Sequence, residues 1–327
     1  MKLGSLLLAF FLPLLTTMAQ VPPLPGPGIN FGNMLEAPKE GEWGVTLKES
    51  YFETVAKAGF RTVRLPIRWS AHALEKPPYT IDPSFLARVD RAVTAAKAQN
   101  LTLILDLHNY DELNTQPDAH APRFLALWKQ IAEHYKDEPP SILFELCNEP
   151  CKALDAGRWN ILVAGTLAVI RPSNPDRTIV VGPVQWNSLE KLPALVLPEN
   201  DTHLLVTVHH YDPFHFTHQG ASWVQGSDAW MGTRWTGSDA DKAPIDAAFD
   251  KLAAWSQAAG RPVFVGEFGA YSKSAMEDRS LWTDYIARAL EARHIPSAYW
   301  EFCSGFGLYD PKSETWREPL LKAVRGN

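Results

Sequence analysis

Cysteine is scarce in this chain of 327 residues, which contains only Cys147, Cys151 and Cys303. A small and odd number of cysteines excludes a fold held together by a complete set of disulfide bonds. The spacing of Cys147 and Cys151, without clustered histidines, is also a poor match to a zinc site. Buried free thiols are therefore expected, and a Cys147–Cys151 disulfide stays open as an alternative in an oxidising compartment.

Excess basic charge and phosphate-binding motifs are lacking as well. The formal net charge is −6 and the sequence has no basic patch, which argues against nucleic acid or anionic membrane as a partner. No glycine-rich loop follows an early apolar run, which disfavours an open doubly wound sheet, the main alternative fold. No low-complexity linker divides the chain, and its length suits a single α/β barrel.

The sequence has no apolar run long enough to cross a membrane. Its N-terminal run, Leu6–Leu15, spans ten residues, whereas a bilayer needs about 20. Lys2 precedes this run and the small residues Thr17 and Ala19 follow it, which is the pattern of a signal peptide. We predict a secreted or periplasmic protein, without membrane contact after cleavage, with this organisation: signal peptide 1–19, extended proline-rich leader 20–28, catalytic barrel 29–327.

What the sequence does contain is a regular alternation of short apolar runs and helical patterns. The predicted strands are Gly28–Phe31, Thr62–Pro66, Thr102–Leu107, Ile142–Leu146, Thr178–Gly182, Leu204–His209, Val263–Glu267 and Ser297–Phe302. The predicted helices are Ser50–Ala58, Pro83–Gln99, Arg123–Tyr135, Arg158–Ile170, Leu189–Leu197, Ile245–Ala259, Met276–Arg293 and Pro319–Val324. Eight such alternations predict a parallel closed sheet, that is, a single (β/α)8 TIM barrel.

Two of the predicted strands deliver a glutamate at their C-terminal ends. The run Ile142–Leu146 leads to Glu149, and Pro150 prevents a central strand from continuing. The seventh run ends at Glu267, just before Gly269. About three βα units separate the two glutamates, which places them on the fourth and seventh strands, across the barrel mouth where TIM-barrel active sites lie. Two carboxylates in that position are what cleavage of a glycosidic bond requires.

The motifs at the strand ends resemble those of glycoside hydrolase family 5, the cellulase-type family of a clan that shares the TIM barrel. The resemblance covers nearly the whole mature chain, and the matching positions are Arg64, His108, Asn148, Glu149, His209, Tyr211, Glu267 and Trp300. It implies a retaining mechanism in two displacements, with Glu149 as acid/base and Glu267 as nucleophile, their carboxyl groups about 5–5.5 Å apart.

The resemblance also assigns supporting roles. It implies that His108 lies near the hydroxyl groups of the cleaved sugar, and that His209 and Tyr211 bind the catalytic carboxylates. It further implies that Trp300 forms an aromatic floor under that sugar. Trp186 and Asn33 are weaker candidates for substrate contacts at strand ends.

Residue chemistry adds expectations that do not depend on the resemblance. A buried Arg64 requires carboxylate partners, and a place beside Glu267 would keep that glutamate ionised. Glu145 is expected inside the barrel, paired with a cation. Asp106 shares the facing of His108 and is expected to orient it.

Alternation along the sixth strand leaves one question of register open. His209 and Tyr211 share a face, which directs His210 away from the barrel interior. The opposite register would turn His210 inward and Tyr211 outward.

The irregular stretch Asp212–Ala243 carries Trp223, Trp230 and Trp235, and we interpret it as a wall of the substrate cleft. The alternative is that its aromatic residues form a small core over the barrel rim.

These features predict an exported, monomeric endo-β-1,4-glucanase that needs neither cofactor nor metal and acts on a β-linked polysaccharide. A mannanase, another β-glucanase or a transglycosylase of the same family remains open, because all use the same residues. Two alternatives come from other classes. One is a metallohydrolase that uses His108 and His209, and the other is a sugar-binding barrel without activity.

Overall fold

The computed structural model describes residues 21–326, so the predicted signal peptide lies outside the described residues. The eight barrel strands are β1 (Gly28–Asn30), β2 (Thr62–Ile67), β3 (Thr102–Leu107), β4 (Ile142–Glu145), β5 (Ile179–Val181), β6 (Leu204–His210), β7 (Val263–Phe268) and β8 (Ser297–Tyr299). Each strand is parallel to its neighbours, and β8 pairs with β1 to close the sheet. The predicted (β/α)8 barrel is confirmed, and the open doubly wound alternative is wrong.

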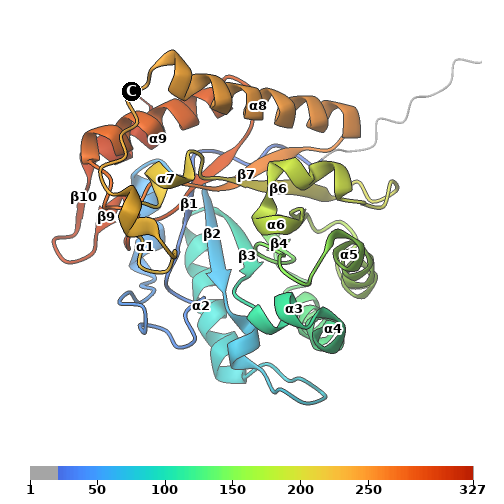
Figure 1. Cartoon of the computed structure of the whole chain (residues 1–327). Helices are drawn as coiled ribbons and strands as arrows, with labels where there is room; N and C mark the ends of the chain where they lie inside the picture. Colours follow the sequence, from blue (N-terminus) through green and yellow to red (C-terminus); the bar gives the residue numbers. More distant parts are fainter. Residues whose placement is uncertain (1–20, 327) are drawn as a thin grey trace, which may run out of the picture.

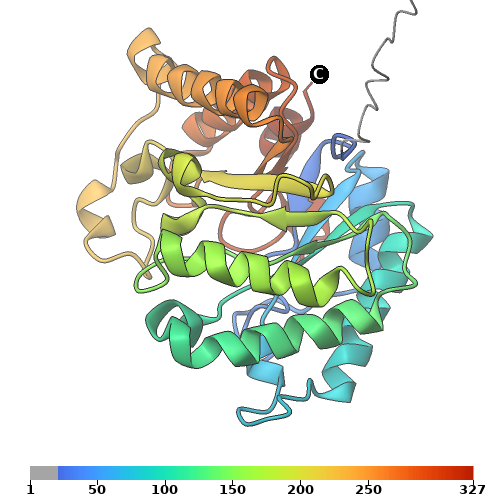
Figure 2. The same ribbon diagram turned by 90° about the vertical axis from the view of Figure 1, so that its right-hand side faces the viewer.

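Helices surround the barrel, as Figures 1 and 2 show from two directions. The α-helices are α1 (Ser50–Lys57), α2 (Pro83–Ala98), α3 (Asp111–Thr115), α4 (Pro117–His134), α5 (Ala156–Ile170), α6 (Val184–Asn187), α7 (Phe214–Thr217), α8 (Asp239–Ala259), α9 (Met276–Glu291) and α10 (Glu318–Arg325). The remaining elements are the 3-10 helices η1 (Trp69–His72), η2 (Leu189–Ala194) and η3 (Ser227–Trp230) and a hairpin of β9 (Tyr309–Asp310) and β10 (Thr315–Trp316). Within residues 21–326, no helix is long and apolar enough to cross a membrane.

Several predicted boundaries were wrong for identifiable reasons. Helix α8 begins at Asp239 rather than at Ile245, because Ser238 and Asp241 form a capping box that starts the helix early. Helix α4 begins at Pro117, since proline suits the first turn of a helix. The expected helix Leu189–Leu197 is a short 3-10 helix that ends at Ala194.

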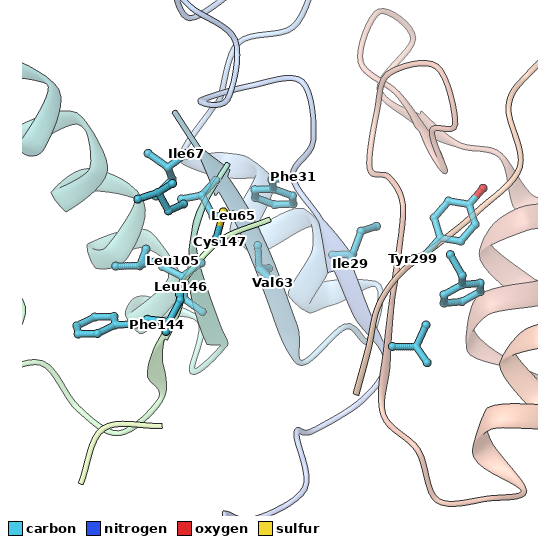
Figure 3. Packing of buried hydrophobic residues seen from close by; sticks show 14 of the residues in the cluster. Ile29, Phe31, Val63, Leu65, Ile67, Leu105, Phe144, Leu146, Cys147 and Tyr299 are labelled. Atoms are coloured by element: carbon cyan, nitrogen blue, oxygen red, sulfur yellow. The ribbon is translucent and has the colours of Figure 1, made fainter. Parts of the chain in front are cut away.

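The main apolar layer lies between the strands and the helices around them. Figure 3 shows part of it, where side chains such as Phe31 and Leu105 leave the strands on the outer face of the barrel. Inside the barrel, a second cluster fills the end at which the strands begin; it consists of Val21, Leu24, Ile104, Leu143, Val180, Leu205, Phe264 and Ala298.

The proline-rich leader contributes to this inner cluster. Val21 and Leu24 are both buried, and they join the side chains at the starts of β3 to β8. The Thr62 hydroxyl donates to the Pro25 carbonyl at 2.6 Å, and the Arg61 amide donates to the Pro27 carbonyl at 3.0 Å. The leader thus closes the floor of the barrel, so the opposite end is the one left for a site.

Candidate active site

Arg64 on β2 occupies the centre of the barrel interior and is fully buried. Its Nη1 donates to Glu267 Oε1 at 2.6 Å, and its Nε and Nη2 donate to Glu145 at 2.7 and 2.8 Å. Nη2 also lies 2.9 Å from Asp106 Oδ2. Burial alone would lower the pKa of Arg64, but the three carboxylates raise it, so the cation is permanent. The expected contact of Arg64 with Glu267 is present, and Arg64 is also the cation that pairs with Glu145.

Glu267 lies near the end of β7 with both carboxylate oxygens held. Besides the Arg64 contact, Oε2 accepts a hydrogen bond from the Tyr211 hydroxyl at 2.7 Å. A register shift between Val208 and His209 places His209 beside Glu267 across the β6–β7 pair. A carboxylate that accepts from a buried guanidinium and a phenol is held in a fixed orientation.

Glu149 has a different environment. Strand β4 ends at Glu145, so Glu149 lies in the following loop rather than on the last residue of the strand, and its φ is 51°. Its Oε1 is 2.8 Å from His209 Nδ1, and none of its contacts within residues 21–326 is with Lys or Arg. Burial raises the pKa of Glu149 to about 7.

The two glutamates are close together but chemically unequal. One oxygen of Glu149, one oxygen of Glu267 and a ring nitrogen of His209 lie within 4.8 Å of one another. This proximity agrees with the separation of about 5–5.5 Å that retaining glycosidases use. A carboxyl that still holds a proton near neutral pH, beside one fixed by a cation, can serve as an acid next to a nucleophile.

His108 and Trp300 lie side by side at the same mouth. His108 Nδ1 is 2.5 Å from Asp106 Oδ2, as predicted, and its ring is nearly parallel to that of Trp300, with the ring centres 5.8 Å apart. Burial lowers the pKa of His108 to about 3, so the ring is neutral. A Cβ on Gly32 would lie 3.0 Å from the Trp300 ring, so this glycine makes room for the indole. The predicted strand Ser297–Phe302 would have included Trp300. Strand β8 ends at Tyr299, so Trp300 lies just beyond it.

His209 and Tyr211 both face the glutamates, and His210 turns the other way. His210 is buried under the outer helices and packs against Phe249 and Trp282. The structure thus has the expected register, and the alternative with His210 inward is wrong.

The remaining predicted residues hold less central positions. Asn148 Oδ1 accepts a hydrogen bond from Arg64 Nη2 at 2.8 Å. Asn33 donates to the Ser304 hydroxyl at 3.0 Å and contacts neither glutamate. Trp186 is 56% exposed, and its backbone N–H donates to the Pro150 carbonyl at 3.4 Å, so it lies at the rim beside the Glu149 loop.

The aromatic residues of the long segment Asp212–Ala243 divide between the main core and the surface. Trp235 is buried in the main core, whereas Trp223 is 58% exposed. Trp223 meets Tyr271 edge-on, with the ring centres 4.8 Å apart, and His218 joins it to Tyr211. A continuous row of aromatic rings therefore runs from the exposed Trp223 to a residue that contacts Glu267.

Two asparagines at the site were missed. Asn30, the last residue of β1, accepts a hydrogen bond from Arg64 Nη1 at 3.1 Å and donates to the Gly266 carbonyl. Asn187 lies 3.1 Å from His209 through its Nδ2. A polar residue that ends a buried apolar strand was the available signal for Asn30, whereas Asn187 lies in an irregular turn beyond β5 and had no comparable signal.

Glu149, His209 and Glu267 are also the residues that could bind a metal ion, so we examined that possibility. His209 Nε2 faces the amide donor of Asn187, and a ring that accepts from this donor carries its proton on Nδ1, the nitrogen that faces both glutamates. A protonated nitrogen is not a metal ligand. Arg64 already neutralises Glu267. The donor set therefore suits proton sharing better than metal binding.

A closed (β/α)8 barrel with one cation-bound glutamate and one glutamate of raised pKa close together at its mouth has the active site of a retaining glycoside hydrolase. The comparison with known families gives the more specific assignment. The family described as Cellulase (glycosyl hydrolase family 5) matches residues 26–305, and the chain belongs to this family.

Individual relatives agree with the family. The chain is 32% identical to Endoglucanase H of Acetivibrio thermocellus over 91% of its own length, but it spans only 32% of that larger protein. The solved endoglucanase Cel5A of Thermotoga maritima is 46% identical, with a TM-score of 0.89 over 91% of this chain and 96% of that one. A structure of the same relative with mannotriose as substrate is 45% identical, with the same TM-score and the same coverage.

Proposed function

We propose that this chain is an exported endo-β-1,4-glucanase that hydrolyses its substrate with retention of configuration. The unequal environments of Glu149 and Glu267 carry the proposal. Glu267 is fixed by Arg64 and Tyr211, and Glu149 has a pKa raised by burial. The endoglucanase names of the relatives support glucan as the substrate class, and the signal-peptide pattern of the sequence supports export.

The geometry supports a double displacement. In the first step, Glu267 attacks the anomeric carbon while the bond from that carbon to the leaving oxygen breaks. Glu149 transfers its proton to that oxygen, and a glycosyl ester on Glu267 results. In the second step, Glu149 takes a proton from water, the water oxygen attacks the anomeric carbon, and Glu267 is released. The proton balance closes over the cycle without a metal or cofactor.

A second substrate class follows from one specific comparison. The relative with mannotriose as its substrate shares 45% of its residues with this chain. We therefore propose β-mannan as a second substrate. Transglycosylation would use the same two steps with a sugar in place of water.

Product analysis tests the proposal. Wild-type protein and Glu267→Ala are incubated with carboxymethylcellulose, mixed-linkage glucan, mannan and xyloglucan. Short β-1,4-gluco-oligosaccharides from the wild type alone support the assignment, and cleavage of mannan alone would change the substrate but keep the mechanism. Equal activity of the mutant would exclude Glu267 as the nucleophile. Polymer binding without cleavage would favour the inactive sugar-binding barrel.

Solution measurements test two further parts of the proposal. We propose that the protein acts as a monomer, and light scattering of the purified protein measures this directly. We also propose cleavage of the signal peptide after Ala19, which N-terminal sequencing of exported protein would detect.

A further inference from the structure

His209 is held between two polar groups on opposite sides of its ring. Its Nδ1 lies 2.8 Å from Glu149 Oε1 and 3.5 Å from Glu267 Oε2, whereas its Nε2 lies 3.1 Å from Asn187 Nδ2. Asn187 is fully buried. A neutral imidazole has one N–H and one lone pair, so the partner of one nitrogen decides the role of the other.

An unusual turn brings Asn187 to this place. Gln185, Trp186 and Asn187 follow β5 in succession with φ values of 58°, 60° and 53°. Each non-glycine residue in this left-handed region costs of order 1 kcal/mol, so three in succession destabilise the turn unless the surrounding structure holds it. The turn sends Trp186 into solvent and Asn187 into the barrel. The residue after it, Ser188, then forms a β-bridge with His209.

The space for the Asn187 amide is specific. A Cβ on Gly182 would lie 2.1 Å from Asn187 Oδ1, so no larger residue fits there without moving the amide. Gly182 itself does not have a positive φ, and its conformation suits other residues. A glycine is therefore needed at position 182 to leave space for the Asn187 amide, and not to allow an unusual backbone conformation.

We propose that Asn187 is a positioning residue that fixes the tautomer of His209. The amide N–H of Asn187 donates to Nε2, which must then carry the lone pair, and the ring proton stays on Nδ1 facing Glu149. Asn187 does not reach the substrate and acts only through His209. This inference rests on the proposed role of Glu149 as the acid/base.

The tautomer matters because Glu149 must release its proton to the leaving oxygen. A His209 that only donates from Nδ1 stabilises the ionised form of Glu149 and cannot accept its proton. The other tautomer would present a lone pair to Glu149, hold the carboxyl proton there and slow its transfer. Burial lowers the pKa of His209 to about 4, so the neutral ring, with one proton to place, is the relevant form.

Other groups around His209 also act on its ring. Glu267 Oε2 lies 3.5 Å from Nδ1 and favours a proton there, whereas Arg64, Glu145 and His108 shift the pKa of the ring from strands β2 and β4 and from the end of β3. At Nε2 the hydrogen-bonding partner is Asn187, so removing its amide changes the nitrogen on the side away from the glutamates.

The first test uses two substrates that differ in their need for an acid. Cellopentaose has a sugar leaving group that must be protonated, whereas dinitrophenyl cellobioside has one that leaves without a proton. For Asn187→Leu we expect kcat/KM to fall roughly tenfold on cellopentaose and to stay within about twofold on the aryl substrate. The fall of kcat/KM above neutral pH should also move to higher pH. Equal losses on both substrates would overturn the proposal.

Three further variants complete this test. Gly182→Ala should give the same selective loss, because its Cβ displaces the Asn187 amide. It replaces Asn187→Leu in this test if that variant does not fold. Gln185→Asn, in the same turn with an exposed side chain, should behave as wild type. Glu149→Ala must show a strongly selective loss on cellopentaose. Failure of that control would contradict the role of Glu149, whereas failure of the Asn187 variants alone contradicts only this inference.

The second test observes the tautomer in unaltered protein. Long-range ¹H–¹⁵N correlation spectra of protein labelled at histidine distinguish a protonated from a bare ring nitrogen, and His209→Gln identifies the signals. We expect a protonated Nδ1 and a bare Nε2 in the wild type, and a mixture of tautomers in Asn187→Leu. A protonated Nε2 in the wild type would overturn the proposal.

Discussion

Arg64 Nη1 lies 2.6 Å from Glu267 Oε1, and the same guanidinium also contacts Glu145 and Asp106. One cation thus compensates three carboxylates in the barrel interior. Glu267, the proposed nucleophile, shares this counter-ion with two fully buried carboxylates, so its position depends on the whole cluster. Catalysis and stability are coupled at Arg64.

Arg64→Lys tests this coupling. Lysine keeps one charge but cannot bind several carboxylates at once in a fixed geometry. We expect kcat/KM on cellopentaose to fall by about 10²–10³ and the free energy of unfolding to fall by about 3 kcal/mol, because carboxylates lose their partner in a buried site. Enzyme kinetics and urea unfolding measure the two effects.

Arg68→Lys is the matched control. Arg68 contacts Asp111, whose side chain is exposed, at 3.3 Å. A surface ion pair contributes about 0–1 kcal/mol, so both measurements should stay near wild type. If Arg64→Lys lost less than tenfold in activity, the contacts of Arg64 would not be what positions Glu267 for catalysis.

The raised pKa of Glu149 predicts the alkaline side of the activity profile. Glu149 must be protonated to act as an acid, and burial raises its pKa to about 7. The protonated fraction falls as the pH rises through that value, so kcat/KM should decline above pH ~7, by about tenfold per pH unit. Rates on cellopentaose across the pH range measure this decline, and the residual activity of Glu149→Gln should lack it.

The same shift predicts how stability depends on pH. The pKa of Glu149 is 4.5 when unperturbed and about 7 in the folded protein, so between these values the folded state binds the proton more strongly. Ionisation of this carboxyl therefore removes stability as the pH rises from 4.5 through 7. Relative to wild type, Glu149→Gln should gain stability over that window in urea unfolding. A difference that does not vary with pH would contradict the raised pKa of Glu149.

The sequence predicted the barrel because apolar runs and helical patterns alternate eight times, a regularity that few folds share. It also predicted the Arg64 cluster, because a buried arginine needs carboxylates. The position of Glu149 was harder to predict from the sequence. Its left-handed backbone conformation, beyond the end of β4, is rare for glutamate and leaves no mark in the residue pattern.

The position of Asn187 was even harder to predict from the residue pattern. Its contact with His209 spans 22 positions in the sequence and depends on three successive left-handed residues, none of which is glycine. Local propensity argues against such a turn, so the residues that surround it determine its conformation. The floor of the barrel was missed for a similar reason, since Val-Pro-Pro-Leu reads as a linker and only the closed sheet provides an apolar surface for it.

The floor of the barrel supports a prediction of a change in stability that leaves activity unaffected. Leu24 is buried against the starts of the strands, at the end of the barrel opposite to the glutamates. Leu24→Ala should lower the free energy of unfolding by about 2–3 kcal/mol, because a buried leucine leaves a cavity. The kcat and KM of the folded protein should not change. Pro23→Ala, whose side chain is exposed, is the control and should leave both properties intact.

Trp186 supports a prediction about substrate length. Its indole is exposed at the rim, and its backbone N–H contacts the Pro150 carbonyl in the loop that carries Glu149. A sugar bound beyond the leaving oxygen would pass this loop and could stack on the indole. For Trp186→Ala we expect KM for cellopentaose to rise roughly fivefold, which corresponds to about 1 kcal/mol of stacking, with little change in kcat.

Dinitrophenyl cellobioside provides the internal comparison, because it has no sugar on the leaving side and should be cleaved by Trp186→Ala as by wild type. Ile161→Ala on α5 is the matched surface control, since Ile161 is 77% exposed on an outer helix and should affect neither substrate. A rise in KM of equal size for both substrates would place Trp186 outside the leaving-group side of the cleft. Its exposure would then reflect only the left-handed turn that directs Asn187 inward.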